Sequence, residues 1–167
     1  PLTSLVPYSM NAESKPELSA SKSGPAMLYV GEIGTYNLNV SYSSGLCSQN
    51  VTRDIIVDTY PDGWQVVENS SGVVDAANHT ITWVNQTIEN GSPWQRQIKL
   101  KAPLEAWCSC GSSLSNTLSV KGYDDCCDCP LNGSATATTF ILCRNESIFR
   151  SSKTASPQPQ ESCRDVT

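Results

Sequence analysis

The chain of 167 residues lacks features that several classes of protein require. No stretch approaches the roughly 20 consecutive apolar residues that span a lipid bilayer, so a membrane-spanning segment is not expected. Lys and Arg form no run, and the net charge is −5 with a pI near 4.8. This balance argues against nucleic acid as a partner, because binding phosphates takes a basic surface.

Residues that carry catalysis are scarce as well. The only histidine, His79, lies inside the sequence Asn78-His79-Thr80, beside a potential glycan, which is a poor setting for a general base. No Gly-x-Ser-x-Gly motif marks a serine nucleophile. Asp58 and Asp62 are interpreted as turn chemistry rather than as the carboxylate pair of a glycosidase. We therefore expect no enzymatic activity and no cofactor.

The two ends carry no targeting features. The chain begins at Pro1 without the basic and hydrophobic regions of a signal peptide, so we expect a mature chain whose signal has been removed. The C-terminal sequence ESCRDVT has no hydrophobic anchor and no sorting signal. Attachment to a cell is then expected to come from assembly or from a partner protein.

The sequence does contain apolar alternation, which is typical of strands with one buried face. In residues 34–42 the apolar side chains are Tyr36, Leu38, Val40 and Tyr42, with a polar residue between each pair. A weak edge strand begins at Pro16 and breaks at Gly24-Pro25, and 70–78 reads as a loop. Further short strands are predicted over 51–58, 64–67, 80–84, 94–102, 114–120 and 135–142. Seven to eight strands without a helical period predict an all-β, immunoglobulin-like antiparallel β-sandwich.

Two arms are expected to flank this sandwich. Residues 1–15 form an N-terminal arm, 16–143 the sandwich, and 144–167 a C-terminal arm with a strand-like segment at 148–157. That segment reads FRSSKTASP and resembles LSASKSGP, which opens the sandwich. An unpaired strand can add to the sheet edge of a second copy and produce head-to-tail polymers. A truncated gene or a disordered tail is the alternative.

Eight of the eleven asparagines stand two residues before Ser or Thr, which makes them acceptors for N-linked glycans. Chance would give about two or three, given the Ser and Thr content. We therefore expect an exported glycoprotein, although Pro93 disfavours the use of Asn90. Turn chemistry is the alternative explanation for the richness in Asn, Ser and Thr. The acceptors are Asn39, Asn50, Asn69, Asn78, Asn85, Asn90, Asn132 and Asn145.

Eight cysteines are expected to form disulfides, as in other exported chains. Zinc binding by the closely spaced thiolates is the alternative. Asp124, Asp125 and Asp128 are interpreted as solvated loop acids, with a calcium site as the alternative. The cysteines are Cys47, Cys108, Cys110, Cys126, Cys127, Cys129, Cys143 and Cys163.

Strict alternation of strand direction would divide the cysteines between two poles. Cys47, Cys108, Cys110 and Cys143 would share one pole, where they can form two bridges. Cys126, Cys127 and Cys129 would share the other, and the odd sulfur would pair with Cys163. Cys163 can return to its own sandwich or reach another chain, and both alternatives stay open.

Several segments, in this order, resemble the repeat family called domain of unknown function eleven. They are SASKSGP, VGEIGTYNLNV, DIIVDTYPDGW, TITWVNQTI, a strand ending in KLKAP, LSNTLSVKGYDD and NGSATATTF, over about residues 16–142. The resemblance implies immunoglobulin-like sandwiches in large bacterial and archaeal surface proteins, with no catalytic residues. This chain differs in its cysteines and in having a single copy.

Two hypotheses about function follow. The first is a structural subunit of an extracellular polymer on a bacterial or archaeal cell, such as a surface layer, sheath or filament, joined by edge-strand pairing and disulfides. The second is an adhesin or carbohydrate-binding module of the cell surface or wall. Trp64, Trp83 and Trp94 are expected in the core, which leaves Trp107 as the loop candidate for stacking on a sugar.

Overall fold

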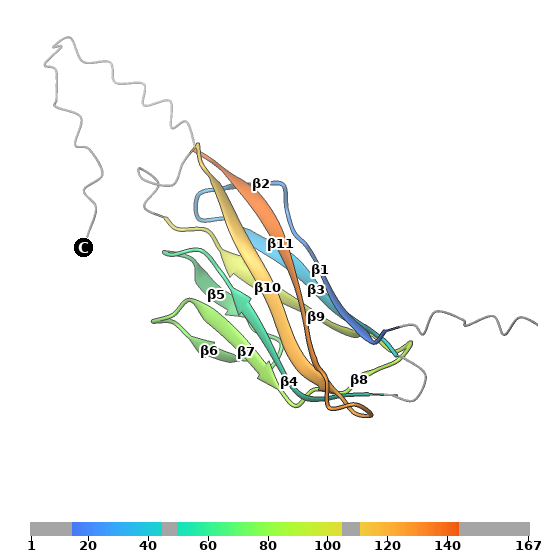
Figure 1. The fold of residues 1–167 in the computed structure, drawn as a ribbon. Coiled ribbons are helices and arrows are strands. Elements are labelled where there is room, and N and C mark those ends of the chain that lie inside the picture. The colour runs from blue at the N-terminus through green and yellow to red at the C-terminus, as the bar shows by residue number, and fades with distance from the viewer. Residues whose placement is uncertain (1–14, 45–49, 105–110, 144–167) are drawn as a thin grey trace, which may run out of the picture.

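The structure, a computed structural model, describes residues 15–44, 50–104 and 111–143. It confirms the expected fold class, because the described chain is a β-sandwich of two packed sheets without helices (Figure 1). The expected arms, including segment 148–157, lie outside the described residues. The strands are β1 (Glu17–Ser23), β2 (Met27–Tyr29), β3 (Ile33–Ser43), β4 (Asn50–Thr59), β5 (Gln65–Glu68), β6 (Val73–Asp75), β7 (Thr80–Val84), β8 (Ile88–Glu89), β9 (Trp94–Lys101), β10 (Ser113–Asp124) and β11 (Pro130–Leu142).

The two sheets are antiparallel except at one edge. One sheet has the order β1-β3-β9-β5. The other has the order β2-β11-β10-β4-β7-β6, with β8 pairing with β4, and its β2 runs parallel to β11. The alternation predicted for residues 34–42 is confirmed, because Tyr36, Leu38, Val40 and Tyr42 of β3 are all buried. The expectation that Trp64, Trp83 and Trp94 lie in the core is also confirmed.

The first strand changes sheets partway along. After β1 the chain passes Gly24 and Pro25 and continues in the same direction as β2, which belongs to the opposite sheet. On this side of the sandwich β11 approaches β1 closely. A Cβ at Gly133 would lie 2.8 Å from the carbonyl oxygen of Leu18, so the close approach depends on glycine.

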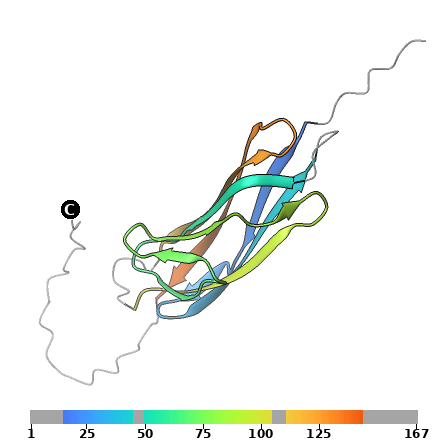
Figure 2. The ribbon, with the colours of Figure 1, turned by 90° about the horizontal axis from the view of Figure 1, so that it is seen from below.

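The described chain enters at one end of the sandwich and leaves at the other. Glu17 at the start of β1 pairs with Ser43, at the end where β4 begins. Leu142 at the end of β11 pairs with Tyr29 at the opposite end. Figure 1 and Figure 2 show that the sandwich is elongated along its strands, so the two ends of the described domain are far apart.

The prediction of seven to eight strands missed three short ones, β2, β6 and β8. The predicted loop at 70–78 is wrong, because Val73–Asp75 is strand β6 paired with β7. This extra strand adds one reversal of the chain, so every later strand runs opposite to the expected direction. The start of β4 therefore lies at the same end as the loop between β10 and β11, since Asp124 pairs with Val51.

Candidate functional site

The potential glycan acceptors lie where a glycan can be attached. Of the seven sequon asparagines that the structure describes, Asn50, Asn78, Asn85, Asn90 and Asn132 are exposed and Asn39 and Asn69 are half-buried. Asn145 lies outside the described residues. The buried asparagine, Asn116, is not part of a sequon. The fold therefore leaves five of the seven described acceptor side chains exposed.

The acceptors are unevenly distributed along the sandwich. Asn50, Asn85, Asn90 and Asn132 all lie toward the end that holds the loop between β10 and β11. At the opposite end, neither β2 nor the three residues of β11 that pair with it belong to a sequon. Met27 and Tyr29 of β2 are 60% and 47% exposed. The sheet edge formed by β2 is thus apolar and lies far from most of the described acceptors.

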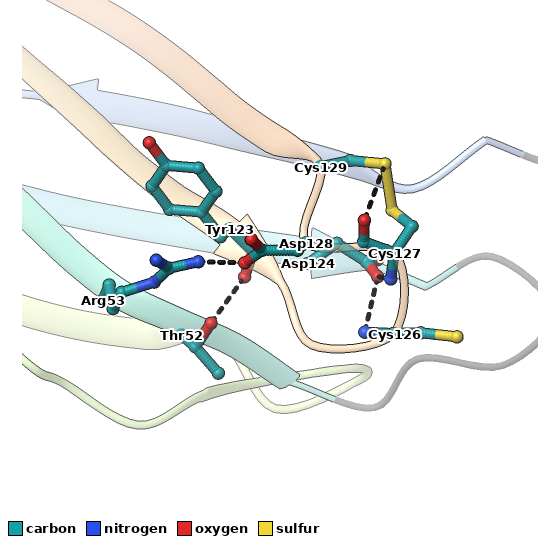
Figure 3. A network of polar contacts seen from close by, with 8 residues as sticks. All are labelled: Thr52, Arg53, Tyr123, Asp124, Cys126, Cys127, Asp128 and Cys129. Carbon is teal, nitrogen blue, oxygen red and sulfur yellow. Dashed lines mark hydrogen bonds and ion pairs between the residues drawn. A yellow bond between two sulfur atoms is a disulfide. The ribbon is translucent and has the colours of Figure 1, made fainter.

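The loop between β10 and β11 is organised by Asp124 (Figure 3). Its Oδ1 accepts hydrogen bonds from the backbone N–H groups of Cys126 (2.9 Å) and Cys127 (3.0 Å). Its Oδ2 accepts a third from the hydroxyl of Tyr42 at 2.7 Å. The interpretation as a solvated acid is therefore wrong for Asp124, which is buried. Its burial is tolerated because the carboxylate accepts hydrogen bonds from the loop and from β3.

A second group of contacts covers the outer side of this loop. The Arg53 guanidinium forms an ion pair with Asp128 and lies over the ring of Tyr123, 4.1 Å from its centroid. Arg53 has a φ of 52° at a bulge of β4, where two of its residues face one of β10, and this backbone conformation turns its side chain toward the loop. Arg53 and Asp128 are both exposed, so the pair contributes little to stability.

The described cysteines are oxidised. Cys127 and Cys129 are joined by a disulfide, and Cys126 and Cys143 are disulfide-bonded as well. Cys47, Cys108, Cys110 and Cys163 lie outside the described residues. The alternation of strand directions behind the expected division into poles is wrong, because Ser44 and Asn50 lie at the end of Cys126 and Cys129, and Cys143 lies at the opposite end. The cause is the extra reversal at β6.

The described ranges provide no ready metal site. No group of three or more His, Cys, Asp or Glu side chains among them is arranged to hold a metal ion. Asp125 approaches Asn50, whose amide donates a hydrogen bond of 3.5 Å to it. A search of the same residues finds no helix able to cross a membrane.

The most unusual feature of the core is a lysine that reaches from one sheet to the other. Lys22 of β1 has a fully buried side chain, and its Nζ donates a hydrogen bond to Oδ2 of Asp58 on β4. The interpretation of Asp58 and Asp62 as turn chemistry is wrong for Asp58, which is completely buried. Asp62 lies at the surface and contacts Nε2 of His79 at 3.2 Å.

Asn116 of β10 completes this group. Leu118 pairs with Asp58 in the ladder between β10 and β4, so Asn116 is the diagonal neighbour of Asp58 on the same inward face. Asn116 is 1% exposed, and its amide favours the charged form of Asp58. Neither polar atom of that amide nor Oδ1 of Asp58 has a well-formed hydrogen bond with the described residues.

Burial governs the protonation of the lysine and the aspartate. Desolvation lowers the pKa of Lys22 to about 8, although the charge of Asp58 opposes the shift. Desolvation also raises the pKa of Asp58, against the opposing effect of Lys22. Burial thus shifts both groups toward their neutral forms, against the attraction between their charges.

Aromatic side chains enclose the group. The Lys22 ammonium lies 5.7 Å from the centroid of the Tyr36 ring. The hydroxyl of Tyr36 forms a hydrogen bond of 2.7 Å with Oγ1 of Thr139 on β11, and its ring packs edge-on against Trp64. Three elements of both sheets therefore bring Lys22, Asp58 and Asn116 together in an apolar setting.

Comparisons with known proteins identify the fold. No family model matches the chain, and no curated protein matches it. Among solved structures it is similar to the major pilin subunit BcpA of Bacillus cereus, with 10% identity, a TM-score of 0.53, and coverage of 77% of this chain and 41% of that chain. It is also similar to the full-length major pilin SpaD from Corynebacterium diphtheriae, with 13% identity, a TM-score of 0.58, and coverage of 74% of this chain and 35% of that chain. The chain thus spans less than half the length of either, and at this identity the likeness establishes an immunoglobulin-like sandwich and no more.

Proposed function

We propose that this chain is a glycosylated, disulfide-stabilised structural subunit of an extracellular polymer, such as a surface layer, sheath or filament. The observation that carries the proposal is the position of the two ends of the described domain. The chain enters at Lys15 beside the end of β3 and leaves at Cys143 beside β2, at opposite ends of an elongated sandwich. Subunits with this geometry can be joined head to tail, and such contacts propagate.

The distribution of acceptor asparagines supports the same proposal. Glycans on Asn50, Asn85, Asn90 and Asn132 would cover one end of the sandwich and restrict pairing there. The edge formed by β2 carries no acceptor and exposes the apolar side chains of Met27 and Tyr29. A strand from a second copy, for which segment 148–157 is the candidate, would add at this edge by backbone hydrogen bonds.

The similar solved structures agree with this kind of role. Both BcpA and SpaD are major pilins, which are subunits of surface polymers. We extend to this chain only the general role of a surface polymer subunit. Its membership in the repeat family called domain of unknown function eleven is part of the same proposal, as is the absence of an enzymatic activity.

The alternative of a carbohydrate-binding module gains little from the structure. Three of the four tryptophans, Trp64, Trp83 and Trp94, are buried, and the indole N–H of Trp94 is held by Gln86 at 3.1 Å. These rings therefore present no face on which a sugar could stack. Trp107 lies outside the described residues.

Gel electrophoresis of protein taken from its native cells tests the proposal. Without reductant we expect a ladder or an aggregate too large to enter the gel, and with reductant a single glycosylated subunit. Replacing the exposed acceptor Asn132→Gln should increase mobility by one glycan, whereas Asn37→Gln, an exposed asparagine outside any sequon, should not. A monomer of unmodified mass under both conditions would contradict the proposal.

A further inference from the structure

The group formed by Lys22, Asp58 and Asn116 is not explained by stability. Burying an ammonium and a carboxylate costs several kcal/mol per ion, and an apolar pair of similar volume often serves a core better. The amide of Asn116 adds a polar group that the fold leaves without a well-formed hydrogen bond. A side chain that is 1% exposed and has no well-formed hydrogen bond on either polar atom is costly unless it has another role.

The arrangement has the chemistry of a nucleophile, a proton carrier and an electrophile. Lys22 ends in an amine, which is nucleophilic when it is neutral. Asp58 contacts that amine through Oδ2 and keeps Oδ1 available on the side of Asn116. The Asn116 carboxamide offers a carbonyl carbon that an amine can attack and a nitrogen that can leave as ammonia.

We propose that Lys22 and Asn116 form a covalent amide bond across the two sheets, with Asp58 carrying the protons. This inference is independent of the proposed polymer. It concerns a modification within a single chain, and it requires no oxidant, cofactor or metal.

The reaction balances with the groups present. One proton passes from the Lys22 ammonium to Asp58, which leaves a neutral amine and a carboxylic acid. The Nζ lone pair attacks Cγ of Asn116 while Asp58 protonates Oδ1. Asp58 then takes a proton from Nζ and delivers it to Nδ2, so that the bond between Cγ and Nδ2 breaks and ammonia leaves. The proton on Oδ1 returns to Asp58 as the carbonyl forms again.

The surroundings favour this step. The side chains of all three residues are buried, and Lys22 lies beside Tyr36, which packs against Trp64, so the access of water to the carbonyl carbon is restricted. Burial lowers the pKa of Lys22 to about 8, which gives a useful fraction of neutral amine at neutral pH, and it raises the pKa of Asp58 so that the acid can hold a proton. General acid and base catalysis of this kind contributes about 10²-fold to 10⁴-fold.

Attack on Asn116 is favoured over attack on Asp58 because it leaves Asp58 free to act as the acid. Direct condensation of Lys22 with Asp58 would expel water from a carboxyl group with no described acid beside it to assist. Attack on Asn116 instead uses Asp58 as that acid and converts the unsatisfied carboxamide into an amide that stays next to the carboxyl group. The three polar atoms without a well-formed hydrogen bond are then explained together.

The bond would change how the domain carries tension. It would connect β1 of one sheet to β10 of the other, so residues 23–115 would lie inside a closed covalent loop. A force applied between the two ends of the described chain would pass through β1, the new bond, β10 and β11. Most of the sandwich would then not extend under load.

Mass spectrometry of the full-length protein after reduction tests the bond. We expect a proteolytic digest to contain a branched peptide that joins Lys22 to Asn116 and is lighter than its two parts by one ammonia molecule. Separate peptides with free Lys22 and intact Asn116, from folded protein, would overturn the proposal. A branched peptide that joins Lys22 to Asp58 with loss of water would overturn it too.

Variants separate the roles of the three residues. Lys22→Arg and Asn116→Ala should abolish the branched peptide, and Asp58→Ala should slow its formation by about 10²-fold or more. Lys121→Arg, at an exposed lysine of β10, is the matched control and should retain it. If the branched peptide forms at an unchanged rate in Asp58→Ala, Asp58 does not carry the protons.

Discussion

Asp124 is a buried carboxylate on which the end of the sandwich depends. It accepts hydrogen bonds from two backbone N–H groups of its own loop and from the hydroxyl of Tyr42 on the other sheet. Hydrogen bonds to a charged acceptor are among the stronger ones, and each buried donor left without a partner is costly. One side chain thus fixes the loop that carries Cys126, Cys127 and Cys129.

Replacing this side chain should therefore destabilise the fold. We expect Asp124→Ala to lower the free energy of unfolding by about 3 kcal/mol, because three donors lose their acceptor. Asp128→Ala in the same loop should cost less than about 1 kcal/mol, since it breaks an exposed ion pair with Arg53. Chemical denaturation of both variants measures the difference, and equal losses would contradict the assigned role of Asp124.

The three polar residues of the core were not predicted as a group, although the sequence contains a signal for each. Lys22 follows Leu18 and Ala20 at alternate positions, Asp58 follows Ile56, and Asn116 stands two residues from Leu118. A strict period of two places all three on inward faces. The sequence alone does not show that these faces meet, because strand directions and pairing must be known first.

The pH dependence of stability tests the environment of Lys22. In an Asn116→Ala variant, where the proposed bond cannot form, Lys22 keeps a free amine. Because its folded pKa of about 8 lies below the unfolded value of 10.5, the unfolded state binds more protons between these values, and stability increases with pH there. We expect a gain on the order of 2 kcal/mol from about pH 8 to about pH 9.5.

The control for this measurement is Lys22→Met in the same Asn116→Ala background, which should remove the increase. Asp58 and Tyr36 face Lys22 as well. The pKa of Asp58 is raised from an acidic value, and that of Tyr36 is raised above 10, so we assign the increase to Lys22. A stability profile that stays level in the single variant would show that Lys22 is not buried as described.

Among the elements, the long strands were predictable and the short ones were not. Alternation over 34–42 and 94–102 identified β3 and β9, because each has enough residues to show a period of two. Strand β6 has three residues, all exposed, and gives no such period. Missing it reversed every later strand and therefore placed Cys126, Cys127, Cys129 and Cys143 at the wrong ends relative to the start of β4.

The contact between β1 and β11 depends on Gly133. A Cβ there would lie 2.8 Å from the Leu18 carbonyl oxygen and 3.2 Å from the Ala20 nitrogen, and both are backbone atoms that cannot move aside alone. We expect Gly133→Val to lower the free energy of unfolding by about 2 kcal/mol by forcing the strands apart. Ser134→Ala, at the exposed neighbouring position, should change it by less than about 0.5 kcal/mol. A thermal melt in which the two variants are equal would refute the close approach.

The edge formed by β2 is the element that should control assembly. Replacing both exposed residues, Met27→Lys and Tyr29→Lys, should reduce the polymerised fraction at least about tenfold, since charges on an edge oppose strand addition. Val73→Lys on the β6 edge, where the side chain is 73% exposed, is the control and should have no effect. Analytical ultracentrifugation measures the polymerised fraction of both variants. Assembly lost only in the β6 variant would place the contact between subunits at the β6 edge instead of the β2 edge.

At the scale of the molecule, the described domain is an elongated sandwich with its chain ends at opposite poles, most of its acceptor asparagines at one of them, and an apolar edge at the other. This polarity suits a subunit that adds to others in one direction. A covalent bond between the sheets and disulfides near both ends would make each subunit resistant to extension. The fold class was predictable from strand spacing, whereas the polarity emerged only from the topology.

Electron microscopy of the glycosylated full-length protein released from its native cells tests the central claim most directly. The account predicts filaments or sheets with a regular subunit repeat, labelled along their length by an antibody against this chain. Dispersed single particles of one sandwich each, under conditions that preserve disulfides, would contradict it.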